Sequence, residues 1–363
     1  MQLVWKKPTV GIKSWCNWED ESQIPFYKNI NCGEENEIPF DIELKAKSLN
    51  LYEEWHDFFN ESKNSSKQFM PKYIFKFREL LNKLKYVLNG PQQIIVIPNI
   101  HYLTSLQCIC WGLTEYENKM YPYKKDQILI HDEFTLEEYS MFRRKVFVEF
   151  GRGLMYSRDF CKLENRDRVL LFNNLVNVFG KLAIAFFSLR VFGHEDPCNL
   201  TLILNTQAGG GTSFRMVGEV YSEPTIATIS NLFKKSSDVF MDQIYLPMKK
   251  IPNFEMIEFS FLIGQYLWST DCIDGLSAEA IILSKKVLTS LNNDIHNYYS
   301  NLNLTNYVLR LTEIIKLTTG VMKHTAVISD IITQARVFEM FEVGEFYFEK
   351  MKIDNPHLIY LMS

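Results

Sequence analysis

Residues 172–192 are the stretch that most constrains how this chain of 363 residues can fold. If the stretch is helical, aromatic and aliphatic side chains reach all of its faces, and its only charged residues are Lys181 and Arg190. A helix that is apolar all round needs apolar neighbours on every side, so it is normally buried in the middle of a domain. We therefore expect other helices to pack on more than one side of it.

Most of the remaining chain also has helical patterns. Apolar residues at steps of three and four, or helix-start residues, predict helices at residues 43–60, 71–89, 102–115, 135–154, 225–239, 254–269, 277–300, 304–323, 327–341 and 343–353. Residues 94–98 indicate a short strand or a buried turn. Residues 201–205 and 213–217 predict a β-hairpin that turns at residues 209–211. Residues 1–45, 60–68 and 117–135 are expected to be irregular. The sum is a mostly α, multilayer domain.

The segment at residues 71–89 predicts an amphipathic helix that stops at Asn89-Gly90-Pro91. Its opposite face is rich in Lys and Arg, and its apolar face consists of Ile74, Phe77, Leu81, Leu84 and Leu88. A helix of this kind can bind a membrane surface or a partner. A surface helix with a solvated basic face is much commoner, and we favour that interpretation.

Composition and charge exclude several classes of protein. The formal net charge of −4 provides no global basic field for nucleic acid, although a local patch stays open. The seven cysteines include no Cys-x-x-Cys pair, which excludes a zinc module built on two such pairs, and their irregular spacing suits a reducing compartment. No apolar run reaches the about 18 residues of a membrane span. We expect a soluble intracellular protein.

No catalytic or metal-binding pattern stands out. The seven histidines include no His-Glu-x-x-His motif, and there is no GxSxG elbow, Walker loop or kinase signature. Cys161 could act as a nucleophile, but nothing near it in the sequence would activate it. We therefore expect a binding protein rather than an enzyme, with no cofactor and no metal.

The stretch around residue 165 matches the pattern of a known family. An aromatic residue, a leucine, an aspartate followed by a basic residue and two apolar residues are spaced as Phe160, Leu163, Asp167, Arg168, Leu171 and Phe172. This spacing resembles the signature of the nuclear hormone receptor ligand-binding domain. Further short matches, similar to the expanded nematode branch of that family, begin at Phe254, Leu267, Gly275, Ile295, Asn306 and Ala335.

The resemblance implies an all-α fold, a three-layer antiparallel helical sandwich with one small β-hairpin, at residues 69–355. Residues 1–68 would be a partly irregular extension and residues 356–363 a tail. Asp167 would be a helix cap or an internal hydrogen-bonding anchor. Glu258 and Arg310 would be buried or half-buried polar groups, which are costly unless they are paired.

The resemblance also implies an apolar pocket for a small lipophilic ligand. The pocket residues would be Phe142, Val146, Phe150, Phe179, Leu182, Phe186, Met216 and Phe338. For any single aromatic side chain among them, plain core packing is the commoner role. A pocket filled by the chain's own side chains would bind no ligand.

The family's last helix completes a groove for coregulator peptides. The residues that would line it here are Arg152, Met155, Arg158, Arg168 and Glu345. Glu345 would hold the N-terminal end of a bound helix through the helix dipole. At the other end the family usually has a lysine five residues before the signature Phe, where this chain has Met155. Arg152 or Arg158 would have to substitute for that lysine.

The five residues Phe77-Arg-Glu-Leu80-Leu81 also resemble the short leucine-rich peptides that nuclear receptors bind. So short a pattern arises easily by chance, and we give it little weight.

Family members of ordinary layout carry two zinc modules ahead of this domain, and residues 1–136 do not supply them. We expect a ligand-binding domain alone, a truncated product or a receptor without DNA contact. It would regulate transcription in the nucleus, and also reside in the cytoplasm, through a lipophilic ligand, coregulators and homo- or heterodimers with other receptors. The alternative is a ligand-independent interaction protein that heterodimerises with or inhibits intact receptors. A helical enzyme of unrecognised type is disfavoured.

Overall fold

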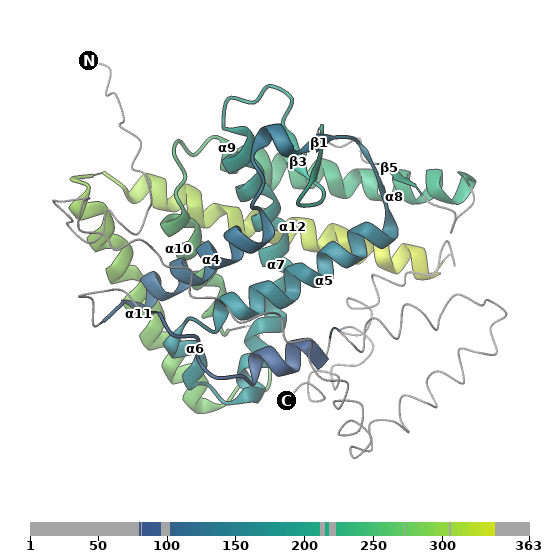
Figure 1. The fold of residues 1–363 in the computed structure, drawn as a ribbon. Helices are drawn as coiled ribbons and strands as arrows, with labels where there is room; N and C mark the ends of the chain where they lie inside the picture. Colours follow the sequence, from purple (N-terminus) through teal and green to yellow (C-terminus); the bar gives the residue numbers. More distant parts are fainter. Residues whose placement is uncertain are drawn as a thin grey trace, which may run out of the picture. The chain divides into compact units, whose positions relative to one another are not determined.

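Helix α7 (Asn165–Phe192) runs through the middle of the domain in the computed structural model (Figure 1). No described side chain between Asp167 and Leu189 is exposed, and Leu175, Phe179 and Leu182 are fully buried. The prediction that residues 172–192 form a helix covered on all sides is therefore confirmed.

The structure describes residues 80, 82–95, 102–210, 215–217, 223–271, 273–304 and 306–337, which lie in one compact unit, Glu79–Ser363. Several predicted features fall outside these residues: the extension at residues 1–68 with its helix at 43–60, the helix at 343–353, the tail at 356–363, and the side chains of Phe338 and Glu345.

The other helices follow the predicted order. They are α4 (Ser105–Met120), α5 (Leu136–Leu154), α6 (Arg158–Lys162), α8 (Glu223–Phe240), α9 (Leu246–Lys249), α10 (Met256–Leu267), α11 (Ala278–Asn301) and α12 (Val308–Val337). A 3-10 helix lies at Lys125–Gln127, and a π-helical segment at Met241–Tyr245 joins α8 to α9. Residues 82–88 are also helical, and the chain turns at Asn89 as predicted.

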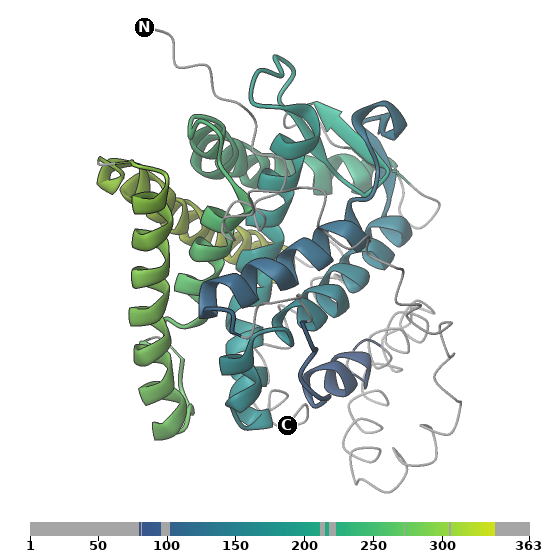
Figure 2. The ribbon, with the colours of Figure 1, turned by 60° about the vertical axis from the view of Figure 1, so that its left-hand side comes forward.

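Three layers of helices build the domain. The middle layer consists of α7 and α10, which contact each other. On one side of this layer α7 packs against α5, and α10 packs against α4. On the other side α7 and α10 both contact α12, and α8 packs against α12 (Figures 1 and 2). The predicted all-α, three-layer fold is therefore confirmed, and it follows from the need of α7 for apolar neighbours on both sides.

Two small sheets lie beside the helices, and the predicted hairpin is wrong in its register. Strand β3 (Leu200–Leu202) pairs antiparallel with β4 (Gln207–Gly210), which also pairs in parallel with β1 (Leu129–Ile130). Strand β5 (Arg215–Val217) pairs instead with β2 (Glu133–Thr135). Gly209 and Gly210 thus lie within a strand rather than at the turn. The small residues of β4 fit a buried strand between two neighbours, and residues 203–206 make the turn.

The two predicted helices at residues 304–323 and 327–341 are one continuous helix, α12. The polar residues between them suggested a break that does not exist. His324 is buried, with Nε2 3.0 Å from the hydroxyl of Ser236 on α8, and the hydroxyl of Thr325 donates to the carbonyl of Val321. Because both polar side chains have partners, the helix continues through them.

Within the part of the chain that the structure describes, no single helix is long and apolar enough to cross a membrane. The two parts of α7, Asn165–Val176 and Val178–Phe192, meet that criterion only when taken together across a 51° bend.

Helices α4 and α5 touch through glycine backbones. A Cβ placed on Gly112 of α4 would lie 2.0 Å from the carbonyl oxygen of Gly153 on α5, a distance at which the backbone must move. The absence of a side chain at this position allows the two helices of the outer layer to pack closely.

We predict that Gly112→Ala destabilises the domain by about 1–3 kcal/mol, the usual cost of overpacking. An alanine in the middle of a helix otherwise adds about 1 kcal/mol of stability relative to glycine, so the sign of the change is diagnostic. Urea unfolding followed by circular dichroism measures it. Gly210→Ala is the control, because its Cβ would meet no atom closer than 3.9 Å. An unchanged or raised stability for Gly112→Ala would contradict this packing.

Burial of His324, together with the charge of Lys181, lowers the pKa of its imidazole to about 3. The unfolded chain binds the proton from about pH 6.5 downwards, whereas the folded chain does not until about pH 3. This stabilising contribution is therefore complete above pH 6.5 and is lost as the pH falls towards 3, by at most about 1.4 kcal/mol per pH unit.

We predict that His324→Gln flattens the decrease of unfolding free energy between pH 7.5 and 5.5. Denaturant unfolding at several pH values provides the comparison, with His131→Gln, at an exposed position, as the control. A wild-type slope that persists in His324→Gln would show that other groups cause the pH dependence.

Candidate functional site

The signature stretch joins α5 to α7 through the short helix α6. The hydroxyl of Ser157 caps α6 by accepting from the backbone N–H of Phe160, and the side chains of Phe160 and Leu163 are buried. This compact turn fixes the start of α7 relative to the end of α5.

Asp167 lies in the first turn of α7 and holds a distant helix in place. Its carboxylate accepts from the backbone N–H of Ser277 at 3.1 Å and from the Ser277 hydroxyl at 2.6 Å. Ser277 is in turn the N-cap of α11, where its hydroxyl accepts from the backbone N–H of Ala280. The buried carboxylate thus has donors and ties the start of α11 to the start of α7.

Arg168, the next residue, binds only backbone carbonyls among the contacts described. Its Nε donates to Leu163 at 2.9 Å, and a terminal nitrogen donates to Cys161. The other terminal nitrogen donates at 2.9 Å to the carbonyl of Leu88, at the end of the helix at residues 82–88. One side chain therefore stabilises the turn and attaches the preceding segment to it.

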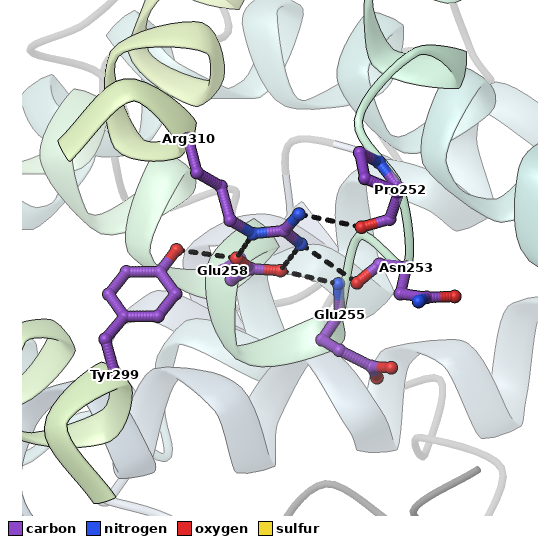
Figure 3. Close-up of polar contacts among 6 residues, drawn as sticks. All are labelled: Pro252, Asn253, Glu255, Glu258, Tyr299 and Arg310. Carbon is purple, nitrogen blue, oxygen red and sulfur yellow. Dashed lines mark hydrogen bonds and ion pairs between the residues drawn. The ribbon is translucent and has the colours of Figure 1, made fainter. Parts of the chain in front are cut away.

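Glu258 and Arg310 form an ion pair at the start of α10 (Figure 3). Glu258 is 1% exposed, and each of its oxygens has two donors. One oxygen accepts from Arg310 Nε and from the hydroxyl of Tyr299, and the other from an Arg310 terminal nitrogen at 2.7 Å and the backbone N–H of Glu255 at 3.0 Å. The carboxylate is therefore fully satisfied, as a buried charge must be.

The same guanidinium also closes the loop before α10. Its terminal nitrogens donate to the carbonyls of Pro252 at 2.7 Å and Asn253 at 3.0 Å. Burial alone would lower the pKa of Arg310, but its hydrogen bonds to Glu258 and the charge of that residue outweigh burial and raise it. The sequence indicated that Glu258 and Arg310 need partners. That they pair with each other, and that Tyr299 and two backbone carbonyls join them, could be seen only in the structure.

Six of the predicted pocket residues lie on α5 and α7. Their side chains are buried: Phe142, Val146, Phe150, Phe179, Leu182 and Phe186. Their rings also contact one another and neighbouring rings. Phe150 stacks on Phe179 with centroids 3.6 Å apart, and Phe186 stacks on Phe259 of α10 at 4.1 Å. Met216 lies on β5.

Sequence reasoning left out three aromatic members of this cluster, Tyr116, Phe187 and Phe259. The Tyr116 ring of α4 lies 5.0 Å from Phe179 and 5.7 Å from Phe187. Tyr116 could have been found by extending the predicted helix at residues 102–115, since α4 continues to Met120.

The predicted groove residues that the structure describes do not form a cluster of free charges. Met155 is buried, and its carbonyl accepts from the backbone N–H of Gln93 at 2.9 Å. Arg152 pairs with Glu149 at 2.5 Å. Arg158 donates to the carbonyl of Leu103, and its guanidinium lies over the Tyr102 ring. Arg152 and Arg158 thus have other partners, and Arg168 is the cation that reaches the helix at residues 82–88.

Cys161 has none of the features of an activated nucleophile. Burial raises the pKa of its thiol to about 11, in spite of the nearby positive charge of Arg168. A thiol of this kind is protonated at neutral pH, whereas catalytic thiols have lowered pKa values.

We predict that Arg310→Met destabilises the domain by about 3–5 kcal/mol, because it leaves Glu258 charged and buried without its cation. The double variant Glu258→Leu/Arg310→Met is expected to lose less, because it removes both charges. Urea unfolding of the two variants gives the comparison. A double variant less stable than Arg310→Met would contradict this interpretation of the pair.

Comparisons with known proteins relate this chain to one family. A sequence model described as the ligand-binding domain of nuclear hormone receptor matches residues 124–338. Three similar proteins from Caenorhabditis elegans are nuclear hormone receptor family members. The match to nhr-213 is 22% identical and covers 75% of this chain and 65% of that protein. The match to nhr-127 is 25% identical and covers 53% of this chain and 55% of that protein. The match to nhr-16 is 28% identical and covers 34% of this chain and 31% of that protein.

The chain thus spans less than two-thirds of the length of each of these relatives. Among solved structures, it is similar to the Ultraspiracle ligand binding domain from Drosophila melanogaster, with 13% identity, a TM-score of 0.44, and coverage of 68% of this chain and 97% of that one. The family resemblance of the signature stretch is confirmed by the sequence model. Since that model matches more than half of the residues, the chain belongs to the family of nuclear hormone receptor ligand-binding domains.

Proposed function

We propose that this chain regulates transcription by binding a small lipophilic ligand and protein partners. The family to which it belongs supports a regulatory, receptor-like role. Ligand binding is supported above all by the row of buried apolar side chains that α5 contributes: Phe142, Val146 and Phe150. A pocket walled by apolar groups suits a lipophilic molecule better than a charged one.

The ring contacts limit where such a ligand would lie. Phe150 and Phe179 are stacked directly on each other, which leaves no space for a ligand between them. The N-terminal half of α5 is the better candidate, because strands β2 and β5, and through β5 helix α8, come together there. We place the ligand beside Phe142 and Val146.

The proposed partners are coregulator proteins and other nuclear receptors, bound as homo- or heterodimers in the nucleus and also in the cytoplasm. The family to which the chain belongs supports partners of this kind. Neither catalysis nor a cofactor is part of this proposal.

A second candidate function is regulation without any ligand, by an interaction protein that heterodimerises with or inhibits intact receptors. The observation that favours it is again the stacking of rings. Phe150, Phe179, Phe186 and Phe259 fill the space between α5, α7 and α10 with the protein's own side chains.

Native mass spectrometry of the protein purified from cells separates these two functions. We expect a co-purified fatty-acid-like or sterol-like mass, and a thermal shift with members of a lipid panel. Val146→Phe, which fills the proposed site from a buried position on α5, should abolish both signals.

The matched control is Met141→Phe, on the same helix but 57% exposed, and it should keep both signals. Cooperative thermal unfolding of each variant checks that it is folded. A ligand-free mass with no thermal shift in the wild type would contradict ligand binding and leave the interaction protein as the function.

A further inference from the structure

The helix at residues 82–88 lies against the other helices of the domain (Figure 2). Leu84 and Leu88 are completely buried and Leu80 is 5% exposed, whereas Tyr86 on the other face is 67% exposed. The sequence pattern favoured a surface helix with a solvated basic face. Among the described residues, Lys83 is exposed and Lys85 half-buried, whereas Leu80, Leu84 and Leu88 are covered.

The C-terminal end of α5 and the first half of α7 lie beside Val87 and Leu88. A Cβ placed on Gly151 of α5 would lie 3.5 Å from Val87 Cγ1, 3.7 Å from Leu88 Cδ2 and 3.6 Å from the Phe172 ring of α7. The helix, Gly151 and Phe172 therefore meet at one place. Because Gly151 has no side chain, the helix approaches α5 closely there.

A cation holds the C-terminal end of the helix on this surface. The last carbonyls of a helix have no donor within the helix and carry partial negative charge. Arg168 donates to the carbonyl of Leu88 at 2.9 Å. Beyond the turn, the backbone N–H of Gln93 donates to the carbonyl of Met155 at 2.9 Å. The contact thus combines leucines in an apolar site with a charged group at the helix end.

Two of the residues that make this contact were also predicted to receive a partner. Met155 and Arg168 are among the predicted coregulator-groove residues, and both touch the segment at residues 88–93. We infer that residues 80–90 are a built-in occupant of the groove, which a short leucine-rich amphipathic helix of a partner protein displaces. This inference rests on the proposed function, because it assumes that coregulators bind at this surface.

The segment is suited to being displaced. Short isolated helices are only marginally stable in water, so the described part of this helix, residues 82–88, depends on the contacts just described. A partner helix with leucines at the same spacing would replace the same contacts. If the segment covers the groove in at least about 90% of molecules, the apparent affinity for a partner falls at least about ten-fold.

Two labelled probes test the inference on the full chain. One is a peptide with the sequence of residues 71–90, and the other is a designed amphipathic helix with leucines at the same spacing and an otherwise unrelated sequence. Leu84→Asp/Leu88→Asp should release the segment, and Lys83→Asp/Tyr86→Asp, on the exposed face, is the matched control. Fluorescence anisotropy gives the Kd values.

We expect both probes to bind the released variant at least ten-fold more tightly than they bind the wild type and the control. If the wild type binds the designed helix as tightly as the released variant does, the groove is open, so the inference is wrong while coregulator binding stands. If no form binds either probe, both the inference and the coregulator part of the proposed function are wrong.

A second measurement covers the case in which the released variant does not fold. In the wild type, an excess of the peptide of residues 71–90 should raise hydrogen exchange of the chain's own amides at residues 82–90. Exchange around Gly151 and Phe172 should stay low, because the added peptide covers them. Unchanged exchange at residues 82–90 in saturating peptide would overturn the inference.

Discussion

The all-round burial of α7 is the constraint on which the rest of this structure depends. A helix without a polar face needs a neighbouring layer on both sides, because an uncovered side would remain in contact with water. Helices α4 and α5 cover one side of the middle layer and α12, with α8, covers the other. Two polar residues at the start of α7 bind segments outside these layers. Asp167 binds Ser277, the N-cap of α11, and Arg168 binds the carbonyl of Leu88.

Hydrogen bonds of buried polar groups connect segments of this domain that are far apart in the sequence. Glu258, Arg310 and Tyr299 join α10, α11 and α12 through hydrogen bonds that satisfy every oxygen of the buried carboxylate. A pair of this kind adds little stability over apolar residues of the same shape, but losing one member is costly. The pair therefore matters mainly for how α10, α11 and α12 are placed relative to one another.

The sequence predicted the helices, their order and the central position of α7, because hydrophobic periodicity reports which positions are buried. It failed where the outcome depends on tertiary partners. His324 and Thr325 looked like a helix break until their bonds to Ser236 and Val321 were known, and the glycines of β4 looked like a turn. The apolar face that includes Leu84 and Leu88 was visible in the sequence. That Leu88 would lie beside Gly151 and Phe172, and that Arg168 would bind its carbonyl, was not.

We infer that a leucine-rich helix of this chain occupies the surface at which a partner helix would bind. A reversible covalent lock tests it most directly. Val87 Cγ1 lies 3.5 Å from the position of a Cβ on Gly151, so Val87→Cys/Gly151→Cys places two thiols within reach of a disulfide. We expect the oxidised protein to bind the designed leucine-rich helix at least about ten-fold more weakly than the same variant binds it after reduction. Equal binding in the oxidised and reduced states, with the disulfide verified by mass, would contradict it.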